Sequence, residues 1–520
     1  MVSRFKVRFA PVASVETPAS QSCSVESLRA NAIATPTFFP QTSYDDTRKH
    51  RSRLSCRECR RRRVKCDETF PVCLRCQRRG DVCESQTRSR LWQPETPWLK
   101  ARKDKTSIIS LSEAATEPIS QLDQKLLRYW LEKASQIMAL DPDNNPFSFP
   151  LLEGPGQIPA MLHAAQSIGS AHQAFFDKSK LNKCLEERAL ALRLIRQELE
   201  QTKKDLTSCF LTVFLLGLSY FWTAGPFIDT ECLRQAQAHF VGGRQLIDFI
   251  LLIPTEERTE QMHFAIGAYL YWEMACCFLI EPEQQQPLNT AQIFSAVQDL
   301  GDKYHPILGY SAEMAYVNAY IGRYCRTVVD TGIRDTVLEA TLEEQLLAWE
   351  PSNSTPELAH LSEAYRSHGL LNLYVVCYRS HTSSEGSPSL AFPTEWLEFD
   401  PELVCLEPTV EESEERDLEA RIHSIALQTV INLTQVPDSH PCTNLQGIPL
   451  LTAGSELTSE DAVERDLVRK RFRAIYSLNH LPANLAAIQL LEEIWSLRDI
   501  GIVVSWLSLM VEHNWHIMLG

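Results

Sequence analysis

The stretch CRECRRRRVKCDETFPVCLRCQRRGDVC, residues 56–83, decides the fold of the first part of this 520-residue chain. Its cysteines follow the pattern C-x2-C-x6-C, which is repeated once at an offset of 17 residues. A C-x2-C pair directs two thiolates at one metal ion, and a third cysteine returns after a short helix. The spacing predicts a zinc site with six ligands: Cys56, Cys59, Cys66, Cys73, Cys76 and Cys83.

The number of thiolates indicates how many metal ions the site holds. Two tetrahedral zinc ions need eight bonds to sulfur, which six thiolates can supply if two of them bridge. The repeat relates Cys56 to Cys73, the first cysteine of each copy, and suggests these two as the bridges. Such a segment needs no hydrophobic core, because metal binding supplies its folding free energy. We therefore expect two structural zinc ions.

The residues between the second and third cysteines are almost all cationic: Arg60, Arg61, Arg62, Arg63 and Lys65. We expect this run on a helix short enough to enter a DNA groove. Residues 47–90 contain 15 Lys and Arg against 5 Asp and Glu, whereas the whole chain has a net charge of −15, so the remainder sums to −25. A basic island on an acidic protein is typical of a DNA-binding module joined to a separate body.

In these residues the sequence resembles the fungal-type Zn(2)-Cys(6) binuclear cluster transcription factors. The resemblance rests on the six cysteines, the basic run from Cys59 to Cys66, and the loop to Cys73 with its proline, Pro71. It implies that the end of the first short helix reads CGG-like triplets in the major groove. The family places a basic residue, usually lysine, four positions after the second cysteine. Here that residue is Arg63, and arginine prefers a bidentate grip on guanine O6 and N7.

Two other interpretations of the cysteines are less favoured. A disulfide knot needs an oxidising compartment, and we see no signal peptide that would direct the chain there. A zinc module that binds protein or RNA would mix histidine among the ligands and space them differently. The adjacent Cys276 and Cys277 lie in an apolar run, where buried structural thiols are commoner than redox sensors.

Composition divides the chain into four parts. Residues 1–46 are rich in Ser, Thr, Pro and Ala, which predicts a disordered tail. We expect the DNA-binding domain in residues 47–90 and a linker in residues 91–120. The linker shows no sustained heptad pattern, so the sequence does not support a coiled-coil dimer there. A homodimer formed through another part of the chain is still possible. Arg48 to Arg53 and the later basic run predict nuclear import.

Residues 121–520 predict an all-α regulatory domain. Apolar residues recur every three or four positions from Leu122 to Met138, and Pro159 suits the first turn of a helix. Residues 206–228 carry no charge, and this uncharged segment is long enough to span a membrane. Their Ser, Thr and Gly residues and their soluble-looking neighbours favour a buried core helix instead.

This region resembles the second type of fungal-specific transcription factor domain, which implies a helical regulatory region without known catalysis. The resemblance rests on the order of six short stretches: 145–147, 159–165, 239–244, 308–311, 448–456 and 490–495. Residues 401–419 combine acidic and apolar side chains, so they suit either an activation segment or a solvated loop.

No phosphate-binding loop, H-E-x-x-H motif or G-x-S-x-G nucleophile elbow is present in the sequence. We therefore expect a nuclear, non-enzymatic regulator of RNA polymerase II transcription that binds double-stranded DNA and the transcription machinery and has no membrane partner. Its targets would be a metabolic or biosynthetic gene set. The alternatives are a ligand-sensing or enzymatic helical body tethered to DNA, and a protein-interaction scaffold. A large polar cavity in the body would favour the sensor or enzyme, and a filled core would count against it.

Overall fold

The computed structural model describes most of the chain from Cys56 to Leu519. The described residues are 56–64, 66, 73–81, 83, 123–141, 145–148, 158–201, 205–224, 228–301, 303–350, 355–379 and 410–519. The expected tail (1–46) and linker (91–120) lie outside these residues. Within them the structure has helices and no strands, apart from one isolated bridge between His305 and Gly309. The prediction of a helical body is confirmed.

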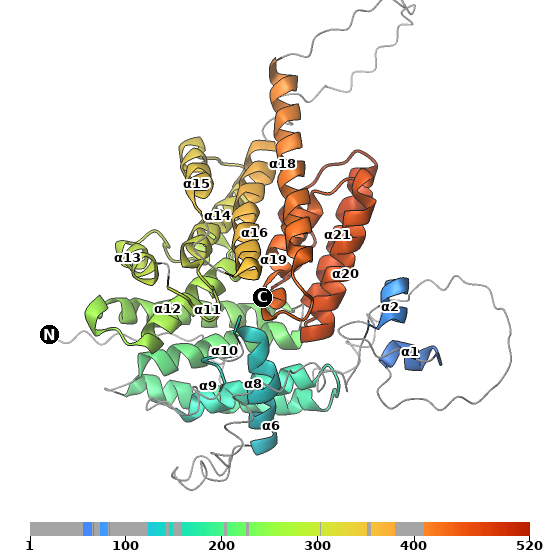
Figure 1. Ribbon diagram of the computed structural model, residues 1–520. Coiled ribbons are helices and arrows are strands. Elements are labelled where there is room, and N and C mark those ends of the chain that lie inside the picture. Colours follow the sequence, from blue (N-terminus) through green and yellow to red (C-terminus); the bar gives the residue numbers. More distant parts are fainter. Residues whose placement is uncertain are drawn as a thin grey trace, which may run out of the picture.

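Two short helices belong to the cysteine-rich segment and lie side by side in Figure 1: α1 (Arg57–Arg61) and α2 (Leu74–Arg79). The first half of the body contains α6 (Gln124–Tyr129), α8 (Pro159–Gln173), α9 (Lys180–Glu200), α10 (Leu206–Ala224), α11 (Thr230–Leu251), α12 (Glu260–Cys276) and α13 (Ala291–Leu300). The second half contains α14 (Ala312–Thr331), α15 (Thr336–Ala348), α16 (Pro356–Asn372), α18 (Val410–Gln435), α19 (Gly447–Ser455), α20 (Ala462–Asn479), α21 (Ala483–Asp499) and α22 (Trp506–Glu512).

Local sequence explains where many of these helices begin and end. Pro159 occupies the first turn of α8, as predicted, where its missing N–H costs nothing. The Asp229 side chain caps α11 by accepting a hydrogen bond from the backbone N–H of Cys232 at 2.8 Å. Gly332 ends α14 with φ +69°, a left-handed conformation that glycine adopts without steric cost.

Some helical segments are irregular. The apolar pattern from Leu122 to Met138 suggests one helix, but α6 continues as a π-helix (Trp130–Ala134) and a 3-10 helix (Ser135–Met138). A second π-helix (Leu373–Tyr378) follows α16. The remaining short 3-10 helices are Thr255–Glu257, Pro282–Gln284, Pro441–Leu445 and Ser459–Asp461.

Helix α10 lies in the interior of the body, between α8 and α11. It is the described helix that is long and apolar enough to cross a membrane, and 89% of its window Leu206–Thr223 is buried inside the protein. A β carbon on Gly217 would lie 2.5 Å from Cζ2 of Trp272, so glycine allows the Trp272 ring of α12 to approach the α10 backbone. Phe214 packs edge-to-face on the same ring at 5.1 Å. These contacts fit the predicted core helix.

Several histidines are buried in the body, and removal from water lowers their pKa. The pKa falls to about 4 for His172, His239 and His305, and to about 3 for His368 and His480. We call these five the desolvated histidines. His172 illustrates their role, because its two ring nitrogens bond Tyr129 Oη at 2.7 Å and the Asn479 carbonyl at 2.8 Å. It thus links α6 to the end of α20.

The acidic stretch 401–419 is described only from Val410, where α18 begins. Glu419 on this helix forms an ion pair with Arg379 at 2.5 Å, and Arg379 also contacts the buried Glu456 at 2.7 Å. At least the end of the stretch therefore packs against the body as helix. Residues 410–419 are thus helix and not a loop, and residues 401–409 lie outside the described residues.

Candidate metal centre and nucleic-acid interface

The structure gathers the six cysteines into two groups that share two members. Cys56, Cys59, Cys66 and Cys73 form one group, and the other consists of Cys56, Cys73, Cys76 and Cys83. Within each group the sulfur atoms all lie within 4.8 Å of one another. The shared pair is the one that the sequence repeat suggested as bridges.

The distances between sulfur atoms suit tetrahedral zinc. Zn–S bonds of about 2.3 Å in a tetrahedron place neighbouring sulfurs about 3.8 Å apart. The Sγ atoms of Cys56 and Cys73 are 3.9 Å apart, those of Cys56 and Cys76 are 3.7 Å apart, and those of Cys59 and Cys73 are 3.6 Å apart. Six soft sulfur donors at this spacing therefore fit two zinc ions.

Backbone N–H groups point at the same sulfurs. Cys59 N donates to Cys56 Sγ at 3.4 Å, and Cys76 N donates to Cys73 Sγ at 3.3 Å. The two bonds are related by the 17-residue repeat, so each helix places its first thiolate in the same way. Hydrogen bonds of this kind stabilise the negative charge of a thiolate that serves as a metal ligand.

The basic run does not form one continuous helix. α1 ends at Arg61, and Arg62 and Arg63 lie in the turn that follows. The helix stops because Arg63 adopts the left-handed conformation, with φ +57°, while the next backbone N–H, that of Val64, donates to the Cys59 carbonyl at 3.0 Å. The expectation that the whole run is helical is therefore wrong. The side chains of Arg60 and Lys65 lie outside the described residues.

The repeat gives this turn an internal reference. Gly80 stands 17 residues after Arg63 and is also left-handed, with φ +67°. The next N–H, that of Asp81, donates to the Cys76 carbonyl at 3.0 Å, which reproduces the bond in the first turn. The second copy thus uses glycine, the residue suited to this backbone, whereas the first uses arginine at a cost of about 1–2 kcal/mol.

Two acidic residues, which the sequence analysis did not single out, organise the neighbouring arginines. Glu58 accepts hydrogen bonds from Arg61 at 2.9 and 2.7 Å and also pairs with Arg62. Arg62 reaches Asp81 at 3.2 Å and so joins the first copy to the second. Arg61, followed by Arg62, lowers the pKa of Glu58 to about 2. The spacing of three and four residues could have signalled the Glu58 pairs, whereas nothing local signals Asp81.

Arg63 differs from its two neighbours. Its side chain is exposed, and within the described part of the chain it has no hydrogen bond or ion pair. Arg61 and Arg62 are exposed by 68% and 37% but each is paired with a carboxylate. On α2, Arg78 and Arg79 are exposed as well. Among the described side chains of the first turn, Arg63 is therefore an unpaired guanidinium beside two paired ones.

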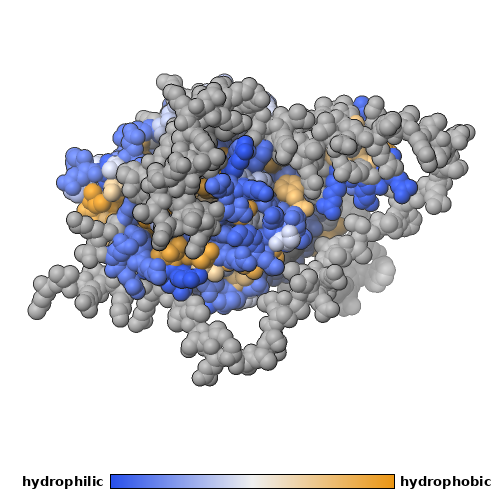
Figure 2. Space-filling view, turned by 90° about the horizontal axis from the view of Figure 1, so that it is seen from below, coloured by the Kyte–Doolittle hydropathy of each residue, from blue (hydrophilic) through white to orange (hydrophobic). Residues whose placement is uncertain are grey.

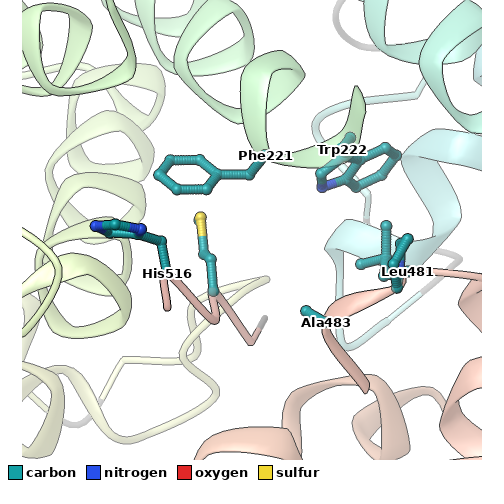
Figure 3. Close-up of a pocket in the computed structure, with 7 residues that line it drawn as sticks. Phe221, Trp222, Leu481, Ala483 and His516 are labelled. Atoms are coloured by element: carbon teal, nitrogen blue, oxygen red, sulfur yellow. The ribbon is translucent and has the colours of Figure 1, made fainter. Parts of the chain in front are cut away.

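Three cavities among the described residues of the core are small. Figure 3 shows one cavity there, where Phe221 and Trp222 from α10 face Leu481, Ala483 and His516. Its volume is about 10 Å³, and two further cavities around Tyr271 measure about 20 Å³ each. Spaces of this size hold about one water molecule. Cavities this small cannot hold a substrate or effector, which counts against an enzymatic or sensing site at these places in the core.

The adjacent thiols Cys276 and Cys277 are fully buried in the body. Burial, together with the nearby Glu273 carboxylate, raises the pKa of both thiols well above the usual value. A thiol that stays protonated is a poor nucleophile and reacts slowly with oxidants. The pair is therefore structural, in agreement with the favoured interpretation.

Comparison with known proteins identifies two families along the chain. The model described as "Fungal Zn(2)-Cys(6) binuclear cluster domain" matches residues 54–93. The model described as "Fungal specific transcription factor domain" matches residues 125–520. A Zn(2)-Cys(6) cluster domain binds two zinc ions, and the spacing of the sulfur atoms fits that number.

Two curated relatives share shorter stretches with the chain. The transcriptional regulatory protein moc3 of Schizosaccharomyces pombe is 40% identical over 57 residues, which are 10% of this chain and 11% of that protein. The C6 finger domain transcription factor hasF of Aspergillus fumigatus is 33% identical over 98 residues, which are 19% of this chain and 13% of that protein. The chain thus spans only about a tenth of the length of these relatives.

No solved structure matches the chain. The family assignment therefore rests on the two domain matches and on the geometry of the cysteines. Because the second model covers most of the sequence, the chain belongs to the family of proteins with a fungal specific transcription factor domain, here preceded by a Zn(2)-Cys(6) binuclear cluster domain.

Proposed function

We propose that the chain is a zinc-dependent, sequence-specific DNA-binding regulator of transcription. The observation that carries this proposal is the exposed Arg63 in a left-handed turn, opposite a glycine in the other copy of the repeat. Residues with strained backbone conformations cluster at functional sites, which supports a role for the Arg63 side chain. An unpaired guanidinium at the tip of a basic module suits a guanine edge in the major groove.

Zinc has a structural role in this proposal. The six cysteines are the ligands, and the shared Cys56 and Cys73 complete both groups of four thiolates. Each group is closed, without the open coordination position that a catalytic zinc keeps for water or substrate. The bound metal would hold α1 and α2 in their mutual orientation, and the chain's own arginines would contact DNA.

The arginines have different proposed roles in DNA binding, which follow from the groups around each side chain. Arg63 reads a base, and the CGG-like triplet implied by the family resemblance supplies guanines for it. Arg61 and Arg62 are positioned by Glu58 and Asp81 and would contact phosphates beside that base. Arg60 and Lys65 remain proposed DNA contacts on the sequence argument alone.

The helical body is proposed as a regulatory region that acts in the nucleus and has no catalytic activity. Support comes from the family match over residues 125–520. On the face in Figure 2, hydrophilic side chains predominate among the described residues, and hydrophobic ones form small separate patches. The transcription machinery, RNA polymerase II and a metabolic or biosynthetic gene set remain proposed partners and targets.

The test is fluorescence anisotropy of the full-length protein with duplexes that contain or lack a CGG triplet. We expect preferential binding of the CGG duplex and a steep loss of affinity between about 50 and 200 mM salt. Addition of a zinc chelator should abolish binding. Equal affinity for both duplexes would refute sequence-specific reading of CGG. Failure to bind either duplex, or binding that is indifferent to salt and chelator, would count against the DNA proposal and favour the scaffold alternative.

A further inference from the structure

A pocket lies at the surface of the body, far along the chain from the cysteine-rich module. It is formed by α13, the start of α14 and the end of α15, and its volume is about 260 Å³. This is more than ten times the volume of the interior cavities and lies just below the ~300–1,000 Å³ typical of small-molecule sites. The pocket has room for a compact ligand.

Aromatic rings dominate the lining of this pocket. Phe294 lies on α13, Tyr310 in the turn before α14, and Tyr316 near the start of α14. Trp349 is the residue that follows α15. Phe294 is 48% exposed, although a phenylalanine in a folded protein is usually covered. Four rings from three separate elements thus meet around one space, and one of them is left open to solvent.

The polar groups of the pocket give it a negative charge. Glu313, on the first turn of α14, contributes a carboxylate, and Gln298 and Gln345 contribute amides. Glu313 is exposed to solvent and has no hydrogen bond or ion pair within the described part of the chain, and none of the described residues that line the pocket is a lysine or arginine. The pocket therefore combines aromatic rings with one negative charge that no lysine or arginine in its lining neutralises.

Rings and a carboxylate in this combination select for organic cations. The negative face of an aromatic ring attracts a cation, and the attraction increases when the cation is shielded from water. An alkylated ammonium loses less hydration than a primary ammonium, and it needs few hydrogen-bond acceptors. The single carboxylate and two amides would not satisfy a strongly hydrated ion.

We propose that the pocket formed by Phe294, Tyr310, Glu313, Tyr316 and Trp349 binds a small organic cation of the quaternary-ammonium class. The rings enclose the alkyl groups, and the Glu313 carboxylate neutralises the charge. The site is independent of the cysteine-rich module and would give the helical body a ligand of its own. Because it joins α13, α14 and α15, a bound cation stabilises the arrangement of these helices.

Calorimetric titration of the full-length protein tests the proposal with two probes of nearly equal shape. Choline carries the charge, and 3,3-dimethyl-1-butanol is its neutral carbon analogue. We expect saturable binding of choline at millimolar or lower concentrations and at least about tenfold weaker binding of the neutral probe. Equal binding of the two probes would mean that the pocket is merely apolar, and no saturable binding of choline would overturn the proposal.

Variants locate the site. Trp349→Ala and Glu313→Gln should each weaken choline binding by about fivefold or more, because one removes a ring and the other the charge. Glu344→Gln is the matched control, since Glu344 is an exposed acid on α15 that does not line the pocket. Each variant is first compared with the parent protein by thermal melting followed by circular dichroism. Unchanged choline binding in folded Trp349→Ala and Glu313→Gln would place the ligand elsewhere and refute the proposal.

Discussion

Replacement of Arg63 by glycine should separate the stability of the cysteine-rich module from its binding of DNA. The change removes the exposed guanidinium and gives the turn the residue that its repeat partner Gly80 already has. Both positions are left-handed, at φ +57° and +67°, and both are followed by the same backbone hydrogen bond of 3.0 Å. The glycine variant therefore has a template within the same protein.

The two effects have opposite signs. Relief of the left-handed strain is worth about 1–2 kcal/mol, partly offset by the greater freedom of glycine in the unfolded chain. Loss of a bidentate contact to guanine costs about 1–3 kcal/mol, which is a factor of about 5–150 in affinity for the CGG duplex. Arg63→Gly should thus fold and hold zinc at least as well as the parent while it loses discrimination between duplexes.

The assay combines two measurements on the full-length protein. A chelator titration with a colorimetric zinc indicator reports metal retention, and fluorescence anisotropy reports affinity for CGG and scrambled duplexes. Gly80→Ala is the mirrored control, because it adds strain to the second turn without touching the proposed reader. Its new β carbon would lie 3.0 Å from Nη1 of Arg473, at the end of a flexible side chain, so most of its cost comes from φ.

Three results would refute this reasoning. Undiminished CGG preference in Arg63→Gly would show that the arginine does not read a base. Equal weakening on every duplex would make it a phosphate contact instead. Earlier loss of zinc from Arg63→Gly than from the parent would show that the side chain supports the fold.

Three further predictions concern the metal, the core and pH. Cys66→Ala should release zinc and abolish DNA binding while the far-ultraviolet circular dichroism of the body persists; retained affinity for DNA would contradict the cluster. Gly217→Ala should lower the free energy of unfolding by about 1–3 kcal/mol in a denaturant titration, because its β carbon meets the Trp272 ring at 2.5 Å; an unchanged midpoint would show that the packing yields. The melting temperature should fall between about pH 6.5 and pH 4, because the desolvated histidines have lowered pKa values in the folded state and the unfolded chain binds more protons there. His480→Asn, which tolerates the same left-handed backbone, should flatten that slope, and a melting temperature independent of pH would contradict the assignment.

Much of the architecture could be predicted because it depends on the spacing and type of residues that are close together in the sequence. The offset between Cys56 and Cys73 is a matter of counting, and it leads directly to the shared pair in the structure. Pro159 marks the start of α8 because proline is tolerated only in the first helical turn. The uncharged α10 could be recognised as a core helix from its polar residues and its neighbours.

Other features depend on contacts that sequence spacing does not encode. The left-handed turn at Arg63 contradicts the preference of arginine, and only comparison with Gly80 in the repeat could have suggested it. The pairing of Arg62 with Asp81 arises when the two copies meet. Glu313 and Trp349 lie on different helical elements, so their shared pocket follows from packing that no local pattern predicts.

The pair of sulfurs common to both groups has a consequence for how the protein senses its supply of metal. If one ion leaves, Cys56 and Cys73 each lose one of their two metal bonds, so two of the four ligands of the remaining ion are no longer held from both sides. Partially loaded molecules should therefore be scarce, and the population should divide between fully loaded and empty chains. A modest fall in available zinc would then silence a fraction of the molecules completely instead of weakening every molecule a little.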